Sequence, residues 1–452
     1  MKHRANLIAL VPNPASSTVP KTSTSHSYDV AIIGGGPAGC ATAITLAGLG
    51  RSVILLEREK FPRFKIGESL LPHSMGAFQR LGILKPLREG PFMEKFGADI
   101  LSADGSRSIR VLFKSAIYAR YDRSFHVTRA DFDKLLLDRA AEVGVEVREE
   151  TCVESVTFTP DFGSVRVRPT GGGNGEEIQA RFVGDCSGRN TVLGPRVARK
   201  TACPELQKFS VFAHYEKVAR EEGVGASLIR IVRGEDSWFW LIPLTPERTS
   251  VGVVMDLAHF KAGGYSGPEE CMDALIRNHP AVADRLRDSR RVTPVRSAGH
   301  YSYRVSPLVG PRWLLAGDAA GFIDPIFSTG VFLALLSGEE GARTVHEVLD
   351  ADKRLAAKRL RAYERKVNRV MDFYLRFVKR WYQPHSIEVF LNPVEHFKIA
   401  SAVNAVLSGK TNNPFSIRWR LWVFYTVIWI HRWIPLVPRS GLSSPPKERG
   451  TA

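Results

Sequence analysis

Three glycines, Gly34, Gly36 and Gly39, follow an apolar run and match the pattern G-x-G-x-x-G. In such a turn the first glycine permits a tight bend, the second lets the backbone approach a pyrophosphate, and the third lets a helix pack closely on a sheet. Ala38 lies at the opening of that helix, whose N-terminal N–H groups favour negative charge. Glu57, at the end of the next apolar run, is placed to accept hydrogen bonds from an adenosine ribose. These five residues predict a site for a dinucleotide.

The segments around these residues must hold them in place. Residues 28–33 predict a buried parallel strand, residues 38–50 a closely packed helix, and residues 51–56 a second strand. This βαβ unit implies a doubly wound sheet. A G-x-G-x-x-G pattern alone could be a plain glycine turn, but the strand, the helix and the acidic residue in this order make the prediction specific.

A second strand–turn–helix pattern lies almost three hundred residues later. Residues 313–316 predict a strand, and Gly317 and Asp318 follow it directly. An Asp at such a turn can hold the ribityl hydroxyls of a flavin while N–H groups at the helix end face the polar edge of the ring. The alternative for Asp318 is a helix cap. The two turns together favour FAD as the dinucleotide.

With both turns, the chain resembles the FAD-dependent oxidoreductases of the para-hydroxybenzoate hydroxylase fold. The resemblance implies that Arg129, which begins a helix predicted for residues 129–143, reaches the diphosphate side of the flavin. The alternative is a salt bridge from Arg129 to Asp133 within the first turn of that helix. Residues 184–189 are similar to a third, weaker motif of these enzymes.

Three further segments are similar to the flavin-dependent halogenases, and more closely to the branch that acts on phenols, pyrroles and carrier-bound aromatic compounds. These segments are residues 61–72, 238–243 and 324–330. The middle segment matches the signature W-x-W-x-I-P of these halogenases at every fixed position. An aromatic core strand is the structural alternative, and geranylgeranyl reductases carry a similar segment.

The halogenase resemblance implies a reaction and a catalytic residue. Reduced FAD and O₂ would form a flavin hydroperoxide, which chloride or bromide converts to hypohalous acid. Lys95 matches the essential lysine that holds and polarises this acid, or becomes a haloamine, beside an electron-rich aromatic substrate. Lysine suits this role because it is a compact donor whose pKa falls on burial. The alternatives are that Lys95 is a surface lysine and that Lys65 has this role instead.

The resemblance also implies a halide site at Ser328, Thr329 and Gly330, just before a helix predicted for residues 330–349. Backbone N–H groups and hydroxyls at such a position can hold an anion. The alternative is a loop-to-helix entry with Ser328 or Thr329 as the N-cap. Phe327 stands where tryptophan halogenases carry a Glu, so tryptophan is a doubtful substrate. The phenol-type branch lacks this Glu as well.

The sequence has no second G-x-G-x-x-G unit for NAD(P)H, so we expect a separate flavin reductase to supply reduced FAD. The substrate is expected to be a small aromatic molecule, either free or bound to a carrier protein. Two other functions stay open. One is an enzyme of the same fold that hydroxylates an aromatic compound or reduces an isoprenoid lipid. The other is a flavin-binding membrane-surface protein without turnover.

These patterns predict an α/β fold: a Rossmann-like FAD-binding domain, a second domain with an antiparallel substrate sheet, and a helical C-terminal extension. Alternating residues at 153–158, 165–168 and 228–232 predict the antiparallel sheet. The expected boundaries are 1–27 for a disordered leader, 28–190 with 291–350 for the FAD-binding domain, 191–290 for the substrate sheet, and 351–452 for the basic helical region.

The composition fits a globular protein of two or three domains, with 452 residues, of which 44% are hydrophobic and 24% charged. The five cysteines show no CxxC spacing, so we expect neither a disulfide framework nor a zinc site. A nucleotide cofactor and reduced cysteines favour the cytoplasm. The apolar run in the leader is shorter than most signal-peptide cores.

The net charge of +17 is concentrated near the C-terminus, where residues 351–452 contain 19 Lys and Arg against 6 Asp and Glu. Within this region, residues 418–435 hold four tryptophans and three arginines around an uncharged run too short to span a bilayer. This segment could lie peripherally on the inner face of the membrane or pack on the catalytic domains. The basic region could also bind an acidic carrier protein. The flavin motifs argue against nucleic acid as a partner.

Overall fold

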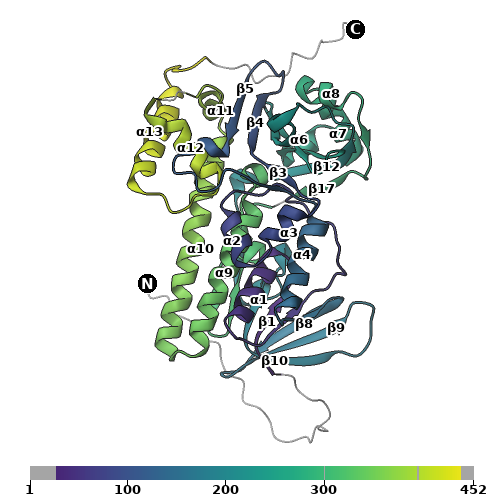
Figure 1. Cartoon of the computed structure of the whole chain (residues 1–452), viewed down its shortest axis with the longest axis vertical. Helices are drawn as coiled ribbons and strands as arrows, with labels where there is room; N and C mark the ends of the chain where they lie inside the picture. Colours follow the sequence, from purple (N-terminus) through teal and green to yellow (C-terminus); the bar gives the residue numbers. More distant parts are fainter. Residues whose placement is uncertain (1–26, 300, 394–395, 439–452) are drawn as a thin grey trace, which may run out of the picture.

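The computed structural model describes residues 27–299, 301–393 and 396–438. Two large sheets lie end to end, and a long helix, α10 (Lys353–Trp381), runs along one side of them to a C-terminal group of helices (Figure 1). The predicted α/β class, with a helical C-terminal region, is confirmed. Residues 1–26 of the expected leader lie outside the described residues, and Ser27 begins the first strand.

The first sheet has the strand order β19-β20-β10-β1-β2-β7. Its five strands from β20 to β7 are parallel, whereas β19 at one edge is antiparallel, as are β9 on β10 and β8 on β9. The strand bounds are β1 Ser27–Ile33, β2 Val53–Leu56, β7 Glu146–Arg148, β8 Thr151–Phe158, β9 Gly163–Pro169, β10 Glu176–Asp185, β19 Val309–Gly310 and β20 Trp313–Leu315.

Helix α1 (Pro37–Gly48) connects β1 to β2, as the sequence predicts for a βαβ unit. Helix α9 (Thr329–Leu349) crosses α1 at very short range. The hydroxyl of Thr42 donates a hydrogen bond to the Gly338 carbonyl at 3.2 Å, and a Cβ on Gly338 would lie 2.5 Å from the Ala38 carbonyl oxygen. This crossing brings the N-terminal dinucleotide turn beside the second turn, which precedes α9.

The second sheet has the order β16-β12-β15-β14-β13-β4-β5, with β17 also paired to β12. It is antiparallel except where β4 runs parallel to β13. The strand bounds are β4 Gly97–Ser102, β5 Ser108–Leu112, β12 Lys208–Glu216, β13 Ile229–Arg233, β14 Ser237–Pro243, β15 Arg248–Asp256, β16 Arg290–Arg291 and β17 Arg296–Gly299.

The prediction for two of the alternating segments was wrong. Residues 153–158 and 165–168 lie in β8 and β9 of the first sheet, whereas residues 228–232 correspond to β13 of the second. Residues 97–112 supply two strands that the expected substrate-sheet boundaries did not include. Alternation reports that one face of a strand is buried but does not identify its partner strand. The domain boundaries themselves stay a prediction.

Each face of the second sheet packs on a different layer. Phe239 and Leu241 of β14 belong to a core shared with helices α7 and α8, whereas Trp238, Trp240 and Ile242 belong to the core that continues into the first sheet. Side chains alternate between the two faces of a strand, so β14 is buried on both sides. The covering helices are α6 Leu257–Ala262, α7 Pro268–Arg277 and α8 Pro280–Leu286.

Shorter elements join these layers. The remaining helices are α2 Ser74–Arg80, α3 Leu84–Glu89, α4 Arg129–Glu142, α5 Gly194–Val197, α11 Pro384–Leu391, α12 Ile399–Leu407 and α13 Phe415–His431. The remaining strands are β3 Met93–Lys95, β6 Ser124–His126, β11 Arg199–Ala202, β18 Tyr303–Ser306 and β21 Gly321–Phe322. The predicted helices at 129–143 and 330–349 are therefore confirmed within a few residues.

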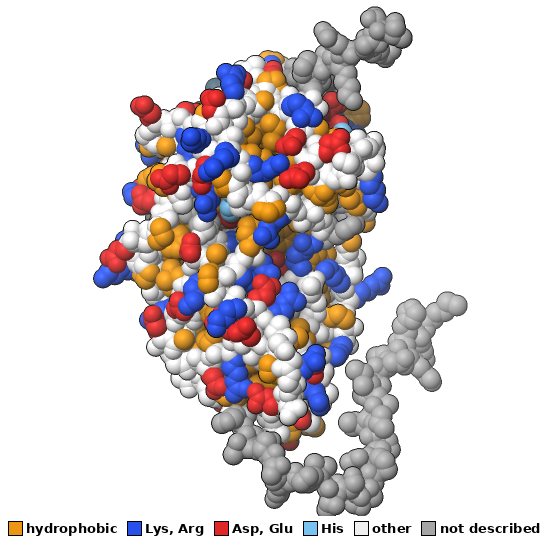
Figure 2. All heavy atoms as spheres, turned by 90° about the vertical axis from the view of Figure 1, so that its right-hand side faces the viewer, with side chains coloured by type: hydrophobic (Ala, Val, Ile, Leu, Met, Phe, Trp, Pro, Cys, Tyr) orange, Lys and Arg blue, Asp and Glu red, His pale blue; other side chains and the backbone are white. Residues whose placement is uncertain are grey.

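Basic and acidic side chains are interspersed on the face opposite the C-terminal helices (Figure 2). All five cysteines are free thiols. In the part of the chain that the structure describes, every helix is too short or too polar to cross a membrane.

The contact between α1 and α9 gives a stability prediction. Gly338→Ala should destabilise the protein by about 1–3 kcal/mol or more, because the new methyl group would meet the Ala38 carbonyl in a closely packed core. Gly48→Ala is the matched control, since a Cβ at Gly48 has no atom within 4 Å and alanine favours helix. Urea unfolding of both variants measures the difference. Equal midpoints for the two variants would contradict the close crossing.

Candidate active site

The first glycine turn lies between β1 and α1 with the geometry that a dinucleotide needs. Gly34 has φ +102°, a conformation that favours glycine. A Cβ on Gly39 would lie 1.8 Å from the Gly34 carbonyl oxygen, so a side chain cannot fit there. The position of a Cβ on Gly36 is open, with its nearest atom 3.7 Å away on Arg63. Ala38 stands in the first turn of α1. The turn therefore offers an open backbone surface at a helix N-terminus.

Glu57 follows the last residue of β2 and is buried. One of its carboxylate oxygens accepts a hydrogen bond from the Gly35 N–H at 2.7 Å, and the other accepts one from the Glu59 N–H at 2.9 Å. Each oxygen keeps a further lone pair. This arrangement fixes the carboxylate beside the glycine turn and leaves it able to accept hydrogen bonds from ribose hydroxyls.

Arg129, at the start of α4, forms the salt bridge that the sequence offered as an alternative. Its guanidinium donates two hydrogen bonds to Asp133, both at 2.8 Å, and a third to the Ile66 carbonyl at 2.6 Å. Burial alone would lower the pKa of Arg129, but Asp133, with a smaller contribution from Asp318, raises it above its ordinary value. The salt bridge does not exclude contact with a diphosphate, which stays a prediction.

The second turn meets the first in space. Gly317 has φ +62°, and a Cβ there would lie 2.7 Å from the Cβ of Ala38. Burial raises the pKa of Asp318 to about 6, against the opposing charges of Arg129 and Arg189. Among the described residues, no group donates a hydrogen bond to the Asp318 carboxylate. An acceptor of this kind fits the ribityl hydroxyls of a flavin.

Lys95 ends the short strand β3 and is only 3% exposed, so the surface-lysine alternative is wrong. Its ammonium donates one hydrogen bond, to the Leu70 carbonyl at 3.2 Å, and lies 5.2 Å from the centre of the Phe113 ring. No carboxylate of the described residues pairs with it. Burial lowers the pKa of Lys95 to about 7, so the amine changes charge near neutral pH. Lys65, by contrast, is partly exposed and forms an ion pair with Glu59.

Several buried polar atoms near Lys95 lack a hydrogen-bond partner among the described residues. β3 pairs with β6, which places Lys95 opposite Ser124 and near His126. The unpaired atoms include Ser124 Oγ, His126 Nδ1 and the Oγ of Ser69, whose backbone is bridged to His126. Buried polar atoms are normally satisfied, so these hydroxyls and the imidazole fit a small polar ligand or water at this place.

The proposed halide residues lie at the start of α9. Ser328 has φ +54° and stands at the N-cap position, yet its side chain makes no capping hydrogen bond. Thr329 is buried and Gly330 follows within the helix. The segment is thus a loop-to-helix entry, as the alternative states, but the hydroxyl of Ser328 does not cap it. Free N–H groups at a helix N-terminus favour an anion.

Residues 67–70 connect the surroundings of Lys95 with the proposed halide residues at the start of α9. The Leu70 carbonyl accepts the hydrogen bond from Lys95, and a Cβ on Gly67 would lie 3.9 Å from a methyl group of Val331 in the first turn of α9. Between them, buried Glu68 holds His214 of the second sheet at 2.8 Å. Sequence reasoning missed this Glu–His pair. Glu68 lies within residues 61–72, a segment that the halogenase resemblance already marks, and this position was the signal that could have found it.

The W-x-W-x-I-P strand contacts this region through a hydrogen-bonded chain. The indole N–H of Trp238 donates to the Tyr382 hydroxyl at 2.9 Å, which lies 3.1 Å from both carboxylate oxygens of Asp324. Tyr382 directly follows α10, so the C-terminal region contributes to the site. Tyr382 could not be identified from the sequence, because its partners lie far away along the chain.

Phe327, at the position where the resemblance implies a Glu in tryptophan halogenases, is also held by α10. Its ring centre lies 5.0 Å from that of Phe377 and 5.5 Å from that of Trp381. Aromatic rings at these separations pack favourably. The position is therefore part of an apolar wall.

Asp324 gives a pH prediction. Burial raises its pKa to about 7, so between about pH 4 and 7 the folded state binds this proton more tightly than the unfolded state. The wild type should lose stability relative to Asp324→Asn as the pH rises through this window, and the difference should then level off. Urea unfolding of both FAD-saturated proteins at a series of pH values measures this difference in the free energy of unfolding. Asp161→Asn, at an exposed site, is the control, and parallel profiles for Asp324→Asn and the wild type would contradict the raised pKa.

The comparisons with known proteins agree with this geometry. A family model described as the FAD binding domain matches residues 27–374. A chlorinase of 1H-pyrrole-2-carbonyl peptidyl-carrier protein from Pseudomonas fluorescens is 33% identical over 346 residues, covering 72% of this chain and 77% of its own. The corresponding brominase from Pseudoalteromonas luteoviolacea is 31% identical over 332 residues, covering 72% and 79%.

The solved structure of the flavin-dependent brominase Bmp2 superposes with a TM-score of 0.81 at 26% identity and covers 90% of this chain and 99% of its own. The matched region includes both flavin turns, Lys95 and the start of α9. The chain is therefore an FAD-dependent oxidoreductase that belongs to the flavin-dependent halogenase family.

Proposed function

We propose that this enzyme chlorinates or brominates an electron-rich aromatic substrate, with Lys95 as the catalytic residue. The observation that carries this proposal is a buried lysine that has no carboxylate partner among the described residues and whose pKa falls to about 7, in a chain of the halogenase family. A buried amine with a perturbed pKa marks a candidate functional site.

The residues on both turns fit FAD. The Gly34–Gly39 turn would hold the diphosphate, Glu57 the adenosine ribose and Asp318 the ribityl chain, with Arg129 on the diphosphate side. When bound in reduced form, FAD supplies two of the four electrons that O₂ needs, and the halide supplies the other two as it becomes hypohalous acid. The overall balance is FADH₂, O₂, halide, one proton and Ar–H giving FAD, Ar–halogen and two waters.

Lys95 acts on the hypohalous acid. In its protonated form the ammonium donates a hydrogen bond to the oxygen and so makes the halogen more electrophilic. The ring carbon of the substrate attacks the halogen, the halogen–oxygen bond breaks, and the hydroxide that leaves takes the ring proton as water. With a pKa of about 7, the amine is also partly neutral and nucleophilic, so a haloamine on Nζ is the second route.

Ser328, Thr329 and Gly330 would hold the halide before it is oxidised. The N-terminus of a 21-residue helix favours an anion there, and the Ser328 hydroxyl is free of a capping bond. The apolar wall of Phe327, Phe377 and Trp381 would keep water away from this part of the site. A weakly hydrated halide is more reactive than a solvated one.

The relatives support one class of substrate. Two of them act on a pyrrole-2-carbonyl group bound to a peptidyl carrier protein, which supports a carrier-bound aromatic acyl group here. The apolar residue at position 327 agrees with a substrate other than tryptophan. A separate flavin reductase would supply reduced FAD, since the sequence has no second dinucleotide turn.

The test is the mass of the product. Protein supplied with reduced FAD by an added reductase, O₂, and either chloride or bromide is incubated with phenols, pyrroles and their carrier-bound forms. We expect a product whose isotope pattern changes with the halide. Lys95→Met should lower its yield by about a hundredfold or more while FAD binding and reduction survive, because only the step after halide oxidation is lost.

Lys65→Met is the matched control and should keep product formation within a few-fold of the wild type, because this lysine pairs with Glu59 near the surface. A gain of one oxygen that is independent of the halide would place the reaction among hydroxylations. Product formation by Lys95→Met at the wild-type rate would show that Lys95 is not the catalytic residue.

A further inference from the structure

Helix α13 (Phe415–His431) has one face fixed to the rest of the protein. Ile417, Leu421, Phe424 and Ile428 are buried at helical spacing, against the neighbouring helices α11 and α12. At its C-terminal end, buried His431 lies 3.0 Å from a carboxylate oxygen of Glu388 in α11. The opposite face of the helix must therefore point away from the protein.

That outer face is apolar as well. Trp422, Trp429 and Trp433 are 68%, 64% and 67% exposed. Of the twelve large hydrophobic side chains that are exposed among the described residues, seven lie within residues 397–436. The other four of these seven are Phe397, Phe415, Ile434 and Leu436. Single exposed apolar residues are ordinary, but a group of this size marks an interaction surface.

The sequence around these tryptophans carries charge of a single sign. The sequence from His396 to Pro438 contains no Asp or Glu. Arg418 and Arg432 are exposed among the aromatic residues, and the guanidinium of Arg432 lies 5.2 Å from the centre of the Trp433 ring. We call the set Arg418, Trp422, Trp429, Arg432 and Trp433 the Trp–Arg surface.

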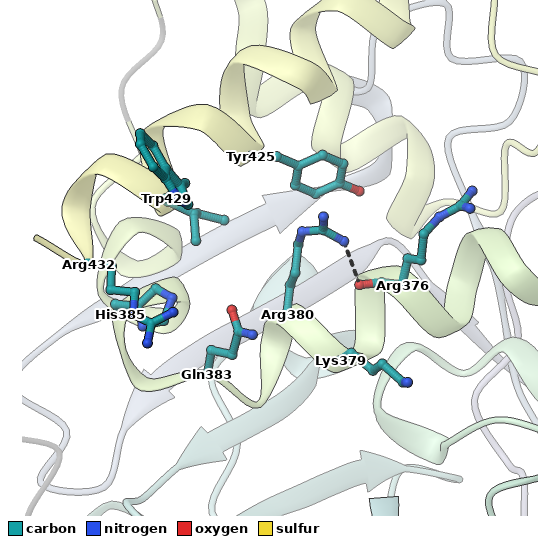
Figure 3. A pocket seen from close by; sticks show the side chains of 9 residues that line it. Arg376, Lys379, Arg380, Gln383, His385, Tyr425, Trp429 and Arg432 are labelled. Carbon is teal, nitrogen blue, oxygen red and sulfur yellow. Dashed lines mark hydrogen bonds between the residues drawn. The ribbon is translucent and has the colours of Figure 1, made fainter. Parts of the chain in front are cut away.

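A basic pocket of about 350 Å³ adjoins this surface between α10 and α13. Figure 3 shows Trp429 and Tyr425 above it, Arg380 beneath Tyr425, and Arg432 beside His385 at one end. No Asp or Glu lines it, and neither Arg376 nor Arg432 forms an ion pair with a described residue. The lining residues are Arg376, Lys379, Arg380, Gln383, His385, Tyr425, Ile428, Trp429 and Arg432.

We propose that the Trp–Arg surface binds the surface of a lipid bilayer that contains anionic phospholipids, and that the basic pocket takes a lipid phosphate. Tryptophan and arginine side chains together favour the boundary between head groups and acyl chains. A helix of 17 residues with its inner face packed on the protein lies along a bilayer rather than across it. The protruding indoles suit insertion among lipids.

This surface is close to the proposed reaction site. The pocket is formed by Arg376, Lys379 and Arg380 on one side of α10, whereas Phe377 and Trp381 on its other side contact Phe327, next to the halide residues. Only one helix separates the bilayer from the apolar wall. If the proposed function holds, membrane binding places the reaction site close to the bilayer surface.

The experiment is sedimentation of the FAD-loaded full chain with vesicles of phosphatidylcholine, with or without phosphatidylglycerol. We expect binding to the vesicles with phosphatidylglycerol, weaker binding to phosphatidylcholine alone, and loss of binding at high salt. Two variants should each bind the vesicles at least about tenfold more weakly than the wild type. They are the triple variant Trp422→Ser, Trp429→Ser, Trp433→Ser and the double variant Arg418→Glu, Arg432→Glu.

Two controls use exposed residues away from helices α11, α12 and α13 (Figure 1): Leu49→Ser, at the end of α1, for an apolar side chain and Lys261→Glu, in α6, for a basic one. Both should bind as the wild type does. Retained FAD and unchanged circular dichroism show that each variant is folded. Wild-type protein that stays in solution with anionic vesicles, or a triple variant that sediments fully, would overturn the proposal. Binding to an acidic carrier protein instead of vesicles would assign the surface to protein docking. None of these results depends on halogenation.

Discussion

The arrangement of this enzyme depends on the burial of Lys95 without a counter-charge in the part of the chain that the structure describes. An ammonium in apolar surroundings is costly, and the protein lowers that cost by letting the pKa of Lys95 fall to about 7. Lys95 is the last residue of β3 and lies where the chain passes between the two sheets. The partner strand β6 leads into α4, which packs on the first sheet, and the strand after β3 is β4 of the second sheet. A single hydrogen bond to the Leu70 carbonyl orients the amine and leaves its other protons for a ligand.

The second constraint is the crossing of α1 and α9, which makes one cofactor site from two distant parts of the sequence. Glycine at position 338 lets the two helices approach, and Gly317 touches Ala38 at the same place. The start of α9 carries the proposed halide residues, and α10 packs Phe327 against Phe377 and Trp381. The halide residues, the proposed flavin contacts and the apolar wall are therefore positioned by one group of helices.

Short sequence motifs predicted the turns and the helix starts of the proposed site, but not the long-range contacts. The glycine turn, Glu57, the strand before Gly317 and the helix after Ser328 could be found because short motifs have fixed backbone requirements. Alternation could not show that residues 153–168 belong to the first sheet, because an alternating strand does not identify its partner strand. Tyr382 and the Glu68–His214 pair were missed for a related reason: long-range contacts unite them, and their residue types are ordinary. The burial of Lys95 also had to come from the fold, since its neighbours in sequence suggest a surface.

The most direct test of the central claim is the pKa of Lys95, measured by nuclear magnetic resonance on protein labelled with ¹⁵N at the lysine side chains. The Lys95→Met variant identifies the signal that belongs to Lys95. We predict an apparent pKa of about 7 for this amine, well below the ordinary value of about 10.4 for a lysine. A pKa for Lys95 near that ordinary value would contradict a buried, unpaired amine and with it the proposed catalytic role.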